Sequence, residues 1–423
     1  MKKITFAVCG MGNRGGVYAG QQLNFPEEMQ VTAMADPKPE RLEAANKYLN
    51  IPAENIFTNA DDMFARPKLA DIMMITTQDA QHKEHALKAM EKGYDLLLEK
   101  PIASRLADIV EIANAAKRLG RTVIVCHVLR YTPFYRTVKR VLDEGKIGQI
   151  MSMDLAEHVG YRHYAHSYTR GNWHNEAKSS PMILAKCSHD MDLIYWLAGA
   201  NCTKLNSFGM QTFYNSGSAP EGAAERCSDC KVENCRFRAH DFYLPRVPKW
   251  PTNVIHPEPT IENITEMLKT SDYGRCVYRM DNDVVDHQTI NLLMGDHITA
   301  TFQMTGFANV DTRPVRIVGT EGELIGDFRS RSLQYHRFGE EEPVTVEVTN
   351  PFGTEFKGHG GGDTGLIADV LKFYRGEEFD SSSITLIDRS VESHYMAFAA
   401  EESRKNGGQV VTMEEFKKRI GAL

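Results

Sequence analysis

The sequence contains no apolar run of the roughly 18 residues that a transmembrane helix needs. It has no excess of basic residues either, because 49 Lys and Arg face 56 Asp and Glu, the net charge is −7, and both signs are mixed along the chain. Its first residues lack the long apolar region and the small-residue cleavage site of a signal peptide. We therefore expect a cytoplasmic protein that binds neither membranes nor nucleic acids.

Cysteine is sparse outside one short stretch, which holds three of the eight cysteines between residues 227 and 235. This distribution fits a reducing compartment better than a disulfide framework. The chain has 423 residues, of which 42% are hydrophobic. At about 100–200 residues per domain, that length predicts two or three domains with ample core.

The first 127 residues alternate short apolar runs with helical stretches. The apolar runs predict strands at Ile4–Cys9, Val31–Ala35, Ile72–Thr76, Tyr94–Leu98 and Thr122–Cys126. The stretches between them predict helices at Glu40–Tyr48, His82–Lys92 and Leu106–Leu119. Because strands that alternate with helices pair in parallel, residues 1–127 are expected to form a doubly wound α/β sheet, with a ligand crevice beyond the carboxyl ends of its strands.

From residue 128 onward the pattern changes to long alternating strands. They are expected at Met151–Val159, Leu205–Phe213, Val284–Met294, His297–Thr305, Val315–Val318 and Leu324–Phe328. A helix precedes them at 134–144, another ends the chain at 387–406, and Gly295-Asp296 predicts a tight hairpin. Residues 128–423 are therefore expected to be an α+β domain with a mixed or antiparallel sheet and a cysteine-containing insertion at about 215–260.

A glycine-rich loop follows the first predicted strand and has the spacing of a dinucleotide fingerprint. Gly10 permits a tight turn, Gly12 lets the backbone approach a pyrophosphate, and Gly15 lets the helix sit close to the strand. Asp36 ends the second strand, 21 residues after Gly15, where a carboxylate accepts hydrogen bonds from both ribose hydroxyls. The loop therefore predicts NAD as the cofactor, with NADP disfavoured, and the alternative is a plain strand-to-helix turn.

Two further segments carry groups suited to proton transfer. Lys100 closes the fourth predicted strand, where desolvation lowers the pKa of an amine; the alternative is a lysine that leaves the sheet and pairs with Glu99. His189 and Asp192 lie three residues apart at the start of an apolar helix and share a face. A neutral imidazole there can take the proton of a hydroxyl, although the pair could merely cap the helix.

Aromatic, basic and amide side chains crowd the segment from His158 to His174. Aromatic faces stack on the C–H face of a sugar ring and the polar groups bind its hydroxyls, so the mixture predicts a polyol pocket. The alternatives are a loop at a subunit contact, or metal binding by His158 or His163. A run of glycines ends at Asp363, just before a predicted helix. We expect Asp363 to cap this helix, and the alternative is that it contacts substrate.

The cysteine cluster has the spacing Cys227-x₂-Cys230-x₄-Cys235. Short spacing lets one loop wrap a single ion, and Zn²⁺ prefers four such ligands, with Cys276 or His240 as the fourth. An iron–sulfur centre and free or transiently oxidised thiols are the alternatives. Because the cluster lies in a polar insertion, a structural zinc is favoured over a catalytic one.

Together these motifs resemble the Gfo/Idh/MocA oxidoreductase family, which includes glucose–fructose oxidoreductase and inositol dehydrogenase. The resemblance rests on motifs across nearly the whole chain, at 10–15, Asp36, 77–82, 99–101, 130–133, 145–148, 189–192, 319–322 and 359–363. It implies a Rossmann domain and a substrate-binding α/β domain whose open sheet forms a homodimer or homotetramer contact. It also implies NAD(P)-linked oxidation of a sugar, glycoside or cyclitol, with Lys100 as the pocket lysine and His189 as the proton-transfer residue.

The resemblance and the motifs together define two sets of predicted site residues. The cofactor-binding set is Gly10, Met11, Gly12, Asn13, Arg14, Gly15, Asp36, Thr77, His82, Glu99, Lys100 and Arg130. The substrate-binding set is Lys100, His127, Tyr161, His163, Trp173, Lys186, His189 and His359.

One position departs from the family pattern. Many of its dehydrogenases carry Asp four residues before the helix histidine, but this chain has Ala185 there, with Lys186 beside it. Lys186, or a tyrosine or histidine of residues 158–174, would have to complete the site. Two other activities fit the family: glycoside cleavage by transient oxidation and elimination, and non-catalytic sugar sensing. The presence of both Lys100 and His189 argues against a sensor.

Overall fold

The computed structural model describes residues 3–353, 356 and 358–422. Its first lobe is built on a six-stranded parallel sheet in the order β3-β2-β1-β4-β5-β6. The strands are β1 Ile4–Cys9, β2 Met29–Ala35, β3 Ile56–Phe57, β4 Ile72–Ile75, β5 Asp95–Leu98 and β6 Val123–Val125. This order confirms the predicted doubly wound sheet, to which the structure adds β3, a strand of only two residues.

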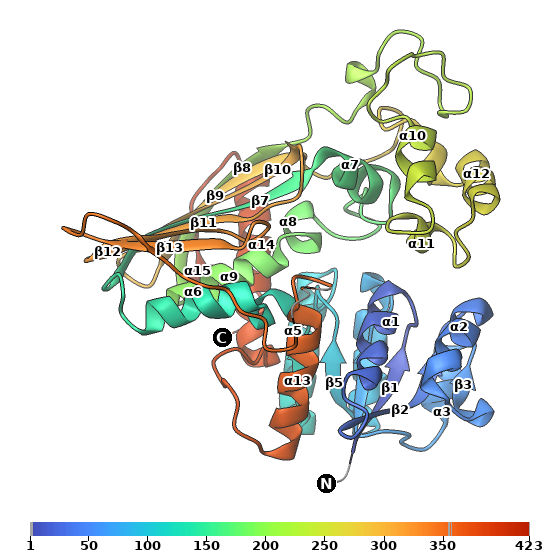
Figure 1. Ribbon diagram of the computed structural model, residues 1–423, viewed down its shortest axis with the longest axis horizontal. Coiled ribbons are helices and arrows are strands. Elements are labelled where there is room, and N and C mark those ends of the chain that lie inside the picture. The colour runs from blue at the N-terminus through green and yellow to red at the C-terminus, as the bar shows by residue number, and fades with distance from the viewer. Residues whose placement is uncertain (1–2, 354–355, 357, 423) are drawn as a thin grey trace.

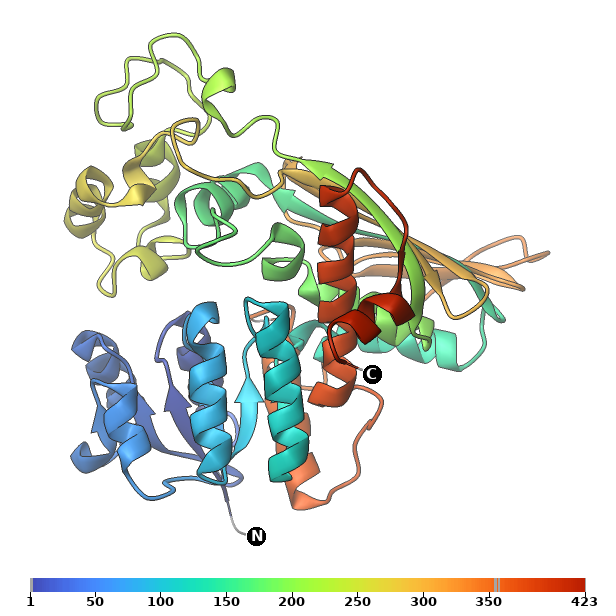
Figure 2. The ribbon, with the colours of Figure 1, turned by 180° about the vertical axis from the view of Figure 1, so that it is seen from behind.

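Helices cover both faces of this sheet (Figures 1 and 2). They are α1 Asn13–Ala19, α2 Pro39–Leu49, α3 Ala60–Ala65, α4 His82–Glu91 and α5 Leu106–Leu119. Side chains alternate along β1, so that Phe6 and Val8 pack toward α1 and α2, whereas Ala7 and Cys9 pack toward α4 and α5. A parallel sheet buried on both faces explains why its strands are continuous apolar runs.

A segment near the end of the chain also packs on this first lobe. Helix α13, Gly362–Arg375, contributes Leu366 and Val370 to the same core as Phe6 and Val8. The backbone N–H of Val125 in β6 then donates to the carbonyl of Thr385 at 2.8 Å. We propose residues 1–127 and 128–423 as the two domains. Helix α13 belongs to the second domain by sequence, but it packs on the sheet of the first.

The second lobe is built on a nine-stranded sheet in the order β14-β13-β12-β11-β7-β10-β9-β8-β15. Its strands are β7 Ile150–Gly160, β8 Cys202–Met210, β9 His287–Met294, β10 Ile298–Ala308, β11 Pro314–Gly319, β12 Gly322–Asp327, β13 Ser332–Arg337, β14 Val344–Thr345 and β15 Val411–Thr412. The pair β7–β10 is parallel and the other pairs are antiparallel, so the sheet is mixed, as predicted. Gly295, at φ +61°, forms part of the turn of the predicted β9–β10 hairpin.

One face of the second sheet is covered by helices and the other is exposed (Figure 1). The covering helices are α6 Pro133–Asp143, α9 Ser188–Ala198, α14 Ile387–Lys405 and α15 Met413–Arg419. Buried and exposed side chains alternate along β8, β9 and β10, as they must when only one face is packed. Within the described ranges, no helix is both long and apolar enough to cross a membrane.

Two segments of the second lobe project from the sheet toward the first lobe. One follows β7 and contains α7 Tyr161–Tyr164 and, further on, α8 Met182–Ala185. The other is the insertion between β8 and β9, with helices α10 Ala239–Tyr243, α11 Thr252–Ile255 and α12 Ile261–Thr270. The insertion has its own small apolar core around Tyr243, Ile264 and Leu268.

Candidate active site

The glycine-rich loop is packed so closely that two of its glycines cannot carry a side chain. Gly10 has φ +100°, and a Cβ built there would lie 2.7 Å from the carbonyl oxygen of Thr76. A Cβ on Gly15 would lie 2.0 Å from the carbonyl oxygen of Gly10. In front of Gly12 the space is open, since a Cβ there would meet only the Arg41 guanidinium at 3.7 Å. The loop therefore leaves room for a pyrophosphate beside the uncapped start of α1.

Asp36 lies at the carboxyl end of β2 and is 4% exposed. Its carboxylate accepts the backbone N–H of Lys38 at 2.9 Å and lies 3.4 Å from Nη1 of Arg41. The carboxylate suits the two ribose hydroxyls of NAD, whereas a nearby guanidinium can hold the extra phosphate of NADP. Arg41 lies in the first turn of α2, and it could not be predicted because it carries no sequence motif of its own. The residues present fit a nicotinamide dinucleotide, and Arg41 leaves both forms open.

Arg14, inside the glycine-rich loop, ties three segments together. Its guanidinium donates to Glu99 at 2.8 Å, to Asp363 at 2.6 Å and to the hydroxyl of Tyr18 at 2.6 Å. Asp363 was expected to cap α13, but its carboxylate pairs with Arg14 and His359 instead and makes no side-chain cap. Although burial raises the pKa of Asp363, the hydrogen bond from His359 and the charge of Arg14 hold that pKa well below its usual range.

Lys100 reaches from the end of β5 to the second lobe. Its ammonium Nζ donates to the backbone carbonyl of Ala185 at 2.9 Å, so the side chain does not turn back to pair with Glu99. The Glu99 carboxylate instead accepts the backbone N–H of Lys100 and the Arg14 guanidinium. Burial lowers the pKa of Lys100, and the charge of Lys186 lowers it further. The amine is therefore easier to deprotonate than an ordinary lysine.

His189 lies in the first turn of α9 and is 5% exposed. Its Nδ1 is buried and has no hydrogen-bond partner among the described residues. Burial, followed by the charge of Lys100, lowers the pKa of His189 well below its ordinary value, so the imidazole is neutral near pH 7. Ala185, four residues earlier in the chain, provides no carboxylate to orient the ring.

The expected pairing of His189 with Asp192 is not present. Asp192 is buried and accepts two hydrogen bonds from Arg130, from Nε and from Nη2, both at 2.6 Å. Arg130 is itself 1% exposed, so the two residues form a buried ion pair, and its predicted cofactor contact stays a prediction. The pair joins the loop after β6 to α9 and positions the helix that carries His189.

A second acid–base group lies on α7. The Nδ1 atom of His163 is 2.7 Å from the carboxylate of Asp311, and the histidine side chain is 22% exposed. Burial lowers the pKa of His163 and the charge of nearby Lys186 lowers it further, whereas the Asp311 carboxylate opposes both. Lys186 in turn lies 3.5 Å from the buried carboxylate of Glu157. Lys186 therefore lies close enough to act on both Lys100 and His163, and the His163–Asp311 pair adds a second acid–base group on this side of the site.

Several residues of the predicted cofactor-binding set make their contacts within the protein itself. The ring nitrogens of His82 lie 2.8 and 3.1 Å from the carbonyl oxygens of Pro101 and Thr77, so His82 joins two loops of the crevice. The hydroxyl of Thr77 lies 3.1 Å from Nδ1 of His85. Met11 is 5% exposed and packs in the core below the loop.

Two residues of the predicted substrate set pack against other aromatic rings. His127 is fully buried between two other histidines. Its ring centroid lies 5.9 Å from that of His189 and 5.5 Å from that of His394. Tyr161 packs edge-on against Phe237 of the insertion at 5.8 Å. Contact of either residue with substrate stays a prediction. His359 does face the site, because its ring lies 6.1 Å from that of His189.

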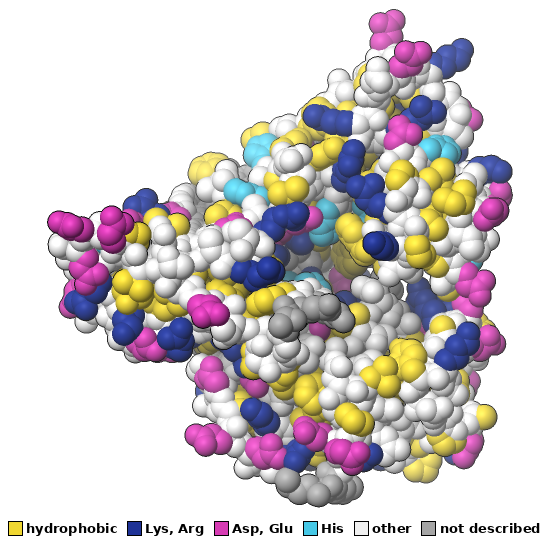
Figure 3. Space-filling view, viewed as in Figure 1, with side chains coloured by type: hydrophobic (Ala, Val, Ile, Leu, Met, Phe, Trp, Pro, Cys, Tyr) yellow, Lys and Arg dark blue, Asp and Glu magenta, His cyan; other side chains and the backbone are white. Residues whose placement is uncertain are grey.

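The two lobes meet across the crevice at Trp173, whose indole N–H donates to Asp79 at 3.1 Å. Figure 3 shows a hollow between the lobes, with histidine and basic side chains gathered around it. Asp79 also acts on the pKa of Lys100, which places it near the reacting groups. Asp79 follows β4, and this position in the sequence could have indicated that it lies in the crevice. Asp311 follows β10 in a loop that carries no sequence signal.

The cysteine cluster lies apart from these groups. All eight cysteines are free thiols, and four of them line one cavity in the insertion. Across the described ranges, no three His, Cys, Asp or Glu side chains converge closely enough to hold a metal ion as they stand. His240, the alternative fourth ligand, does not line that cavity.

Comparisons with known proteins agree with this architecture. Residues 4–127 match the NAD-binding Rossmann fold of the Gfo/Idh/MocA oxidoreductase family, and residues 135–233 match the Gfo/Idh/MocA C-terminal domain. YteT of Bacillus subtilis (strain 168), which carries an oxidoreductase name, is 24% identical over 393 residues, covering 88% of this chain and 89% of that protein.

Shorter matches include enzymes with named substrates. scyllo-Inositol 2-dehydrogenase (NAD(+)) of Bacillus subtilis (strain 168) is 27% identical over 214 residues, 49% of this chain and 57% of that enzyme. 2,7-Anhydro-N-acetylneuraminate hydratase of Escherichia coli (strain K12) is 25% identical over 197 residues, 46% of this chain and 50% of that enzyme.

A solved levoglucosan dehydrogenase in complex with NADH shares the fold, with a TM-score of 0.70, 18% identity and coverage of 97% of this chain and 99% of that one. The sequence matches span both lobes, and the solved structure reproduces their arrangement. This chain belongs to the Gfo/Idh/MocA family of NAD-binding oxidoreductases.

Proposed function

We propose that this protein is an NAD-dependent dehydrogenase that oxidises a hydroxyl of a sugar, glycoside or cyclitol. The observation that supports it is the meeting of Lys100 and His189, both with lowered pKa, beside the glycine-rich loop. The family supports the same reaction, because an NAD-dependent inositol dehydrogenase is among this chain's relatives. Hydroxyl-rich substrates also match the polar and aromatic wall formed by His163, Trp173 and Trp250.

The proposed mechanism divides the work between the two residues. Neutral His189 takes the proton of the substrate hydroxyl, and Lys100 donates a hydrogen bond to the same oxygen as negative charge develops on it. A nicotinamide dinucleotide held by the glycine-rich loop and Asp36 would supply the acceptor for the hydride that leaves the carbon. Arg14 and Glu99 hold the glycine-rich loop against β5, which keeps the cofactor side of the crevice fixed relative to Lys100.

Incubation with NAD and a panel of sugars, glycosides and cyclitols tests the proposal through the absorbance of NADH. We expect Lys100→Met and His189→Asn each to lower kcat by about 10²–10⁴-fold. Their affinity for NAD, measured by fluorescence titration, should change little. Full turnover in both variants would show that the assignment is wrong.

A second candidate function is NAD-assisted cleavage of a glycoside or related ether by elimination. It is favoured by the His163–Asp311 pair, because elimination needs a second proton-transfer group besides His189, and by the hydratase among the relatives. In that reaction the hydride returns to the substrate and no NADH accumulates. Product formation without NADH release, together with loss of activity in His163→Asn, would favour this second function.

Cofactor choice is a finer part of the proposal. Asp36 favours NAD, so the Kd for NAD is expected to be lower than that for NADP. Arg41→Ala should weaken NADP binding further and leave NAD binding nearly unchanged, because the ribose hydroxyls bind the carboxylate. Tighter binding of NADP than of NAD by the wild-type protein would refute the role given to Asp36.

A further inference from the structure

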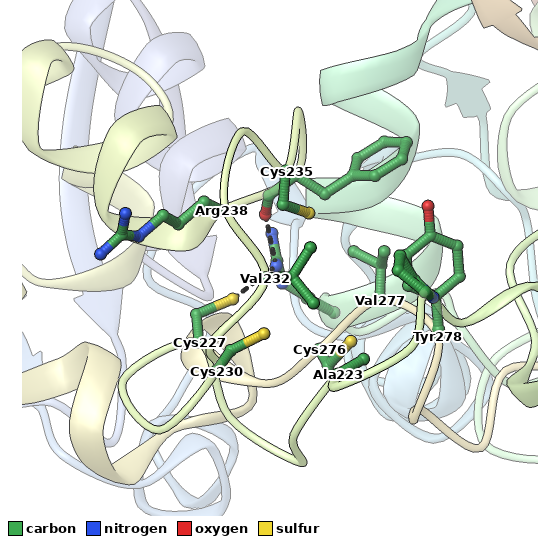
Figure 4. Close-up of a pocket in the computed structure, with 12 residues that line it drawn as sticks. Ala223, Cys227, Cys230, Val232, Cys235, Arg238, Cys276, Val277 and Tyr278 are labelled. Atoms are coloured by element: carbon green, nitrogen blue, oxygen red, sulfur yellow. Dashed lines mark hydrogen bonds between the residues drawn. The ribbon is translucent and has the colours of Figure 1, made fainter.

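The insertion between β8 and β9 contains a small cavity that the proposed reaction does not use. Four cysteines line it: Cys227, Cys230, Cys235 and Cys276 (Figure 4). It encloses about 20 Å³, room for one water-sized guest. Neither Lys100 nor His189 lines this cavity.

Backbone pairing brings the distant fourth cysteine to the other three. The N–H of Cys227 donates to the carbonyl of Gly274 at 2.9 Å, and the N–H of Cys276 donates to the carbonyl of Glu225 at 2.9 Å. Between these bonds, Arg226 and Arg275 form an antiparallel bridge. The bridge holds the two segments in register, with Cys227 and Cys276 at diagonal positions on either side of it, and both residues are 8% exposed.

A buried cation next to the thiols lacks a negative partner. Arg170 is 2% exposed, and its Nη2 donates to Sγ of Cys227 at 3.5 Å and to the carbonyl of Phe237 at 2.8 Å. Its Nη1 has no hydrogen-bond partner, and in the described part of the chain no carboxylate forms an ion pair with it. A buried charge is costly unless it is paired, so this guanidinium calls for an anion at the position of the cysteines.

We propose that Cys227, Cys230, Cys235 and Cys276 bind one Zn²⁺ ion as thiolates. Each thiol releases its proton to solvent, and the ion with four thiolates has a net charge of −2, which the Arg170 guanidinium partly offsets. The sulfur atoms do not converge in the structure, so the bound ion draws them together by side-chain rotation. Four protein ligands leave no open position, and the zinc therefore holds the insertion together and takes no part in catalysis.

The physical need for such an ion lies in the size of the insertion. The insertion spans the residues between Met210 and His287, and the part around Tyr243, Ile264 and Leu268 has only a small core of its own. Residues beside the cysteines, such as Phe237 and Val277, pack in the main core instead. Small units with little core commonly depend on a metal ion or disulfides for stability. Zinc would fix the loop of residues 227–235 to the segment before β9.

Metal analysis of the whole protein, purified under reducing conditions and dialysed with and without added ZnSO₄, tests the proposal. We expect one zinc ion per chain in the wild type and less than a tenth in Cys227→Ser and Cys276→Ser. The matched control is Cys202→Ser, which changes a buried cysteine of β8 and should keep full zinc content. Wild-type protein that holds less than a tenth of an ion after incubation with ZnSO₄ would overturn the proposal.

A second measurement uses the wild-type protein, so its result does not depend on whether the cysteine variants fold. Replacement of zinc by Co²⁺ in the wild type should give the absorption of a tetrahedral tetrathiolate, and His240→Ala should leave that spectrum unchanged. Titration of thiols in denatured, zinc-stripped protein should find all eight. Six thiols, with a disulfide within the cluster, or an octahedral Co²⁺ spectrum would show that the cysteines do not form a metal site.

Discussion

At the scale of single residues, the site is defined by a missing carboxylate. Ala185 stands where many relatives have aspartate, its carbonyl accepts the Lys100 ammonium, and Nδ1 of His189 has no partner among the residues described. Without a carboxylate to stabilise the imidazolium, burial and the charge of Lys100 keep the pKa of His189 low. A base of low pKa stays neutral across the physiological range and loses activity only on acidification.

This state of His189 predicts the pH dependence of the enzyme. The acid limb of kcat/KM should lie below pH 6.5, because the pKa of His189 is lowered from that value. Ala185→Asp places a carboxylate beside the ring, favours its protonated form and should move the limb upward by about one pH unit. Asparagine has the shape of aspartate without its charge, so Ala185→Asn should leave the acid limb of kcat/KM at its wild-type pH. Equal movement in both variants would contradict the electrostatic argument.

Two adjacent glycines of α1 allow a matched comparison. Gly15→Ala places a methyl group 2.0 Å from the carbonyl oxygen of Gly10, a backbone atom that cannot move aside without opening the loop. We expect a loss of about 2–4 kcal/mol in the free energy of unfolding and weaker NAD binding. Gly16→Ala meets nothing within 4 Å and should stabilise the protein by about 0.5–1 kcal/mol through helix propensity. Urea denaturation measures both, and similar values for the two variants would refute the packing argument.

At the scale of elements, Arg14 is the link between the glycine-rich loop, β5 and α13. Its side chain is 22% exposed, and its partners Glu99 and Asp363 are 8% and 3% exposed. A segment more than 340 residues further along the chain thus completes the cofactor side of the crevice. The sequence motifs identified both ends of this link without indicating that they touch.

Removal of that link should be costly. Arg14→Met keeps most of the side-chain volume but leaves two largely buried carboxylates without their cation, so we expect a loss of about 3 kcal/mol in the free energy of unfolding. Asp363→Asn removes one of those carboxylates, and the double variant should therefore lose less than the sum of the single losses. Strictly additive effects in urea denaturation would show that the ion pair has no coupling energy.

The elements themselves were largely predictable, and the exceptions have physical causes. Helix α5 was predicted at its observed limits, because an amphipathic stretch ends at Gly120 in the left-handed conformation. Strand β3 was missed because two residues carry no periodicity. The buried pairing of Arg130 with Asp192 was not predicted, because it is a long-range contact that no local pattern indicates.

At the scale of the whole molecule, the sequence predicted two lobes and a crevice between them, but not how the lobes are joined. Helix α13 crosses back to the first sheet, and Trp173 of the second lobe donates to Asp79 of the first. His163 and Asp311 are far apart in the sequence, and they meet because each follows the carboxyl end of one of two neighbouring parallel strands, β7 and β10. Such contacts depend on sheet register, which a single sequence does not specify.

The exposed face of the nine-stranded sheet is the surface through which we expect a homodimer or homotetramer to form. Phe208 on β8 and Phe307 on β10 are 57% and 43% exposed, although large apolar side chains are normally covered. The face also presents uncharged polar side chains such as Gln303, together with the charged Asp154 and Arg316, which lie opposite each other on β7 and β11.

Charge introduced on this face should dissociate the assembly. In Phe208→Glu/Gln303→Glu, association would bring four like charges onto one interface, where they would lose hydration without gaining partners. Light scattering after size-exclusion chromatography should show the wild type at two or four times the chain mass and the variant at 47.6 kDa. Leu23→Glu adds charge at a residue of the first lobe that is 62% exposed, and should leave the assembly intact. A monomeric wild type, or a variant that stays assembled, would show that the sheet face is not the contact.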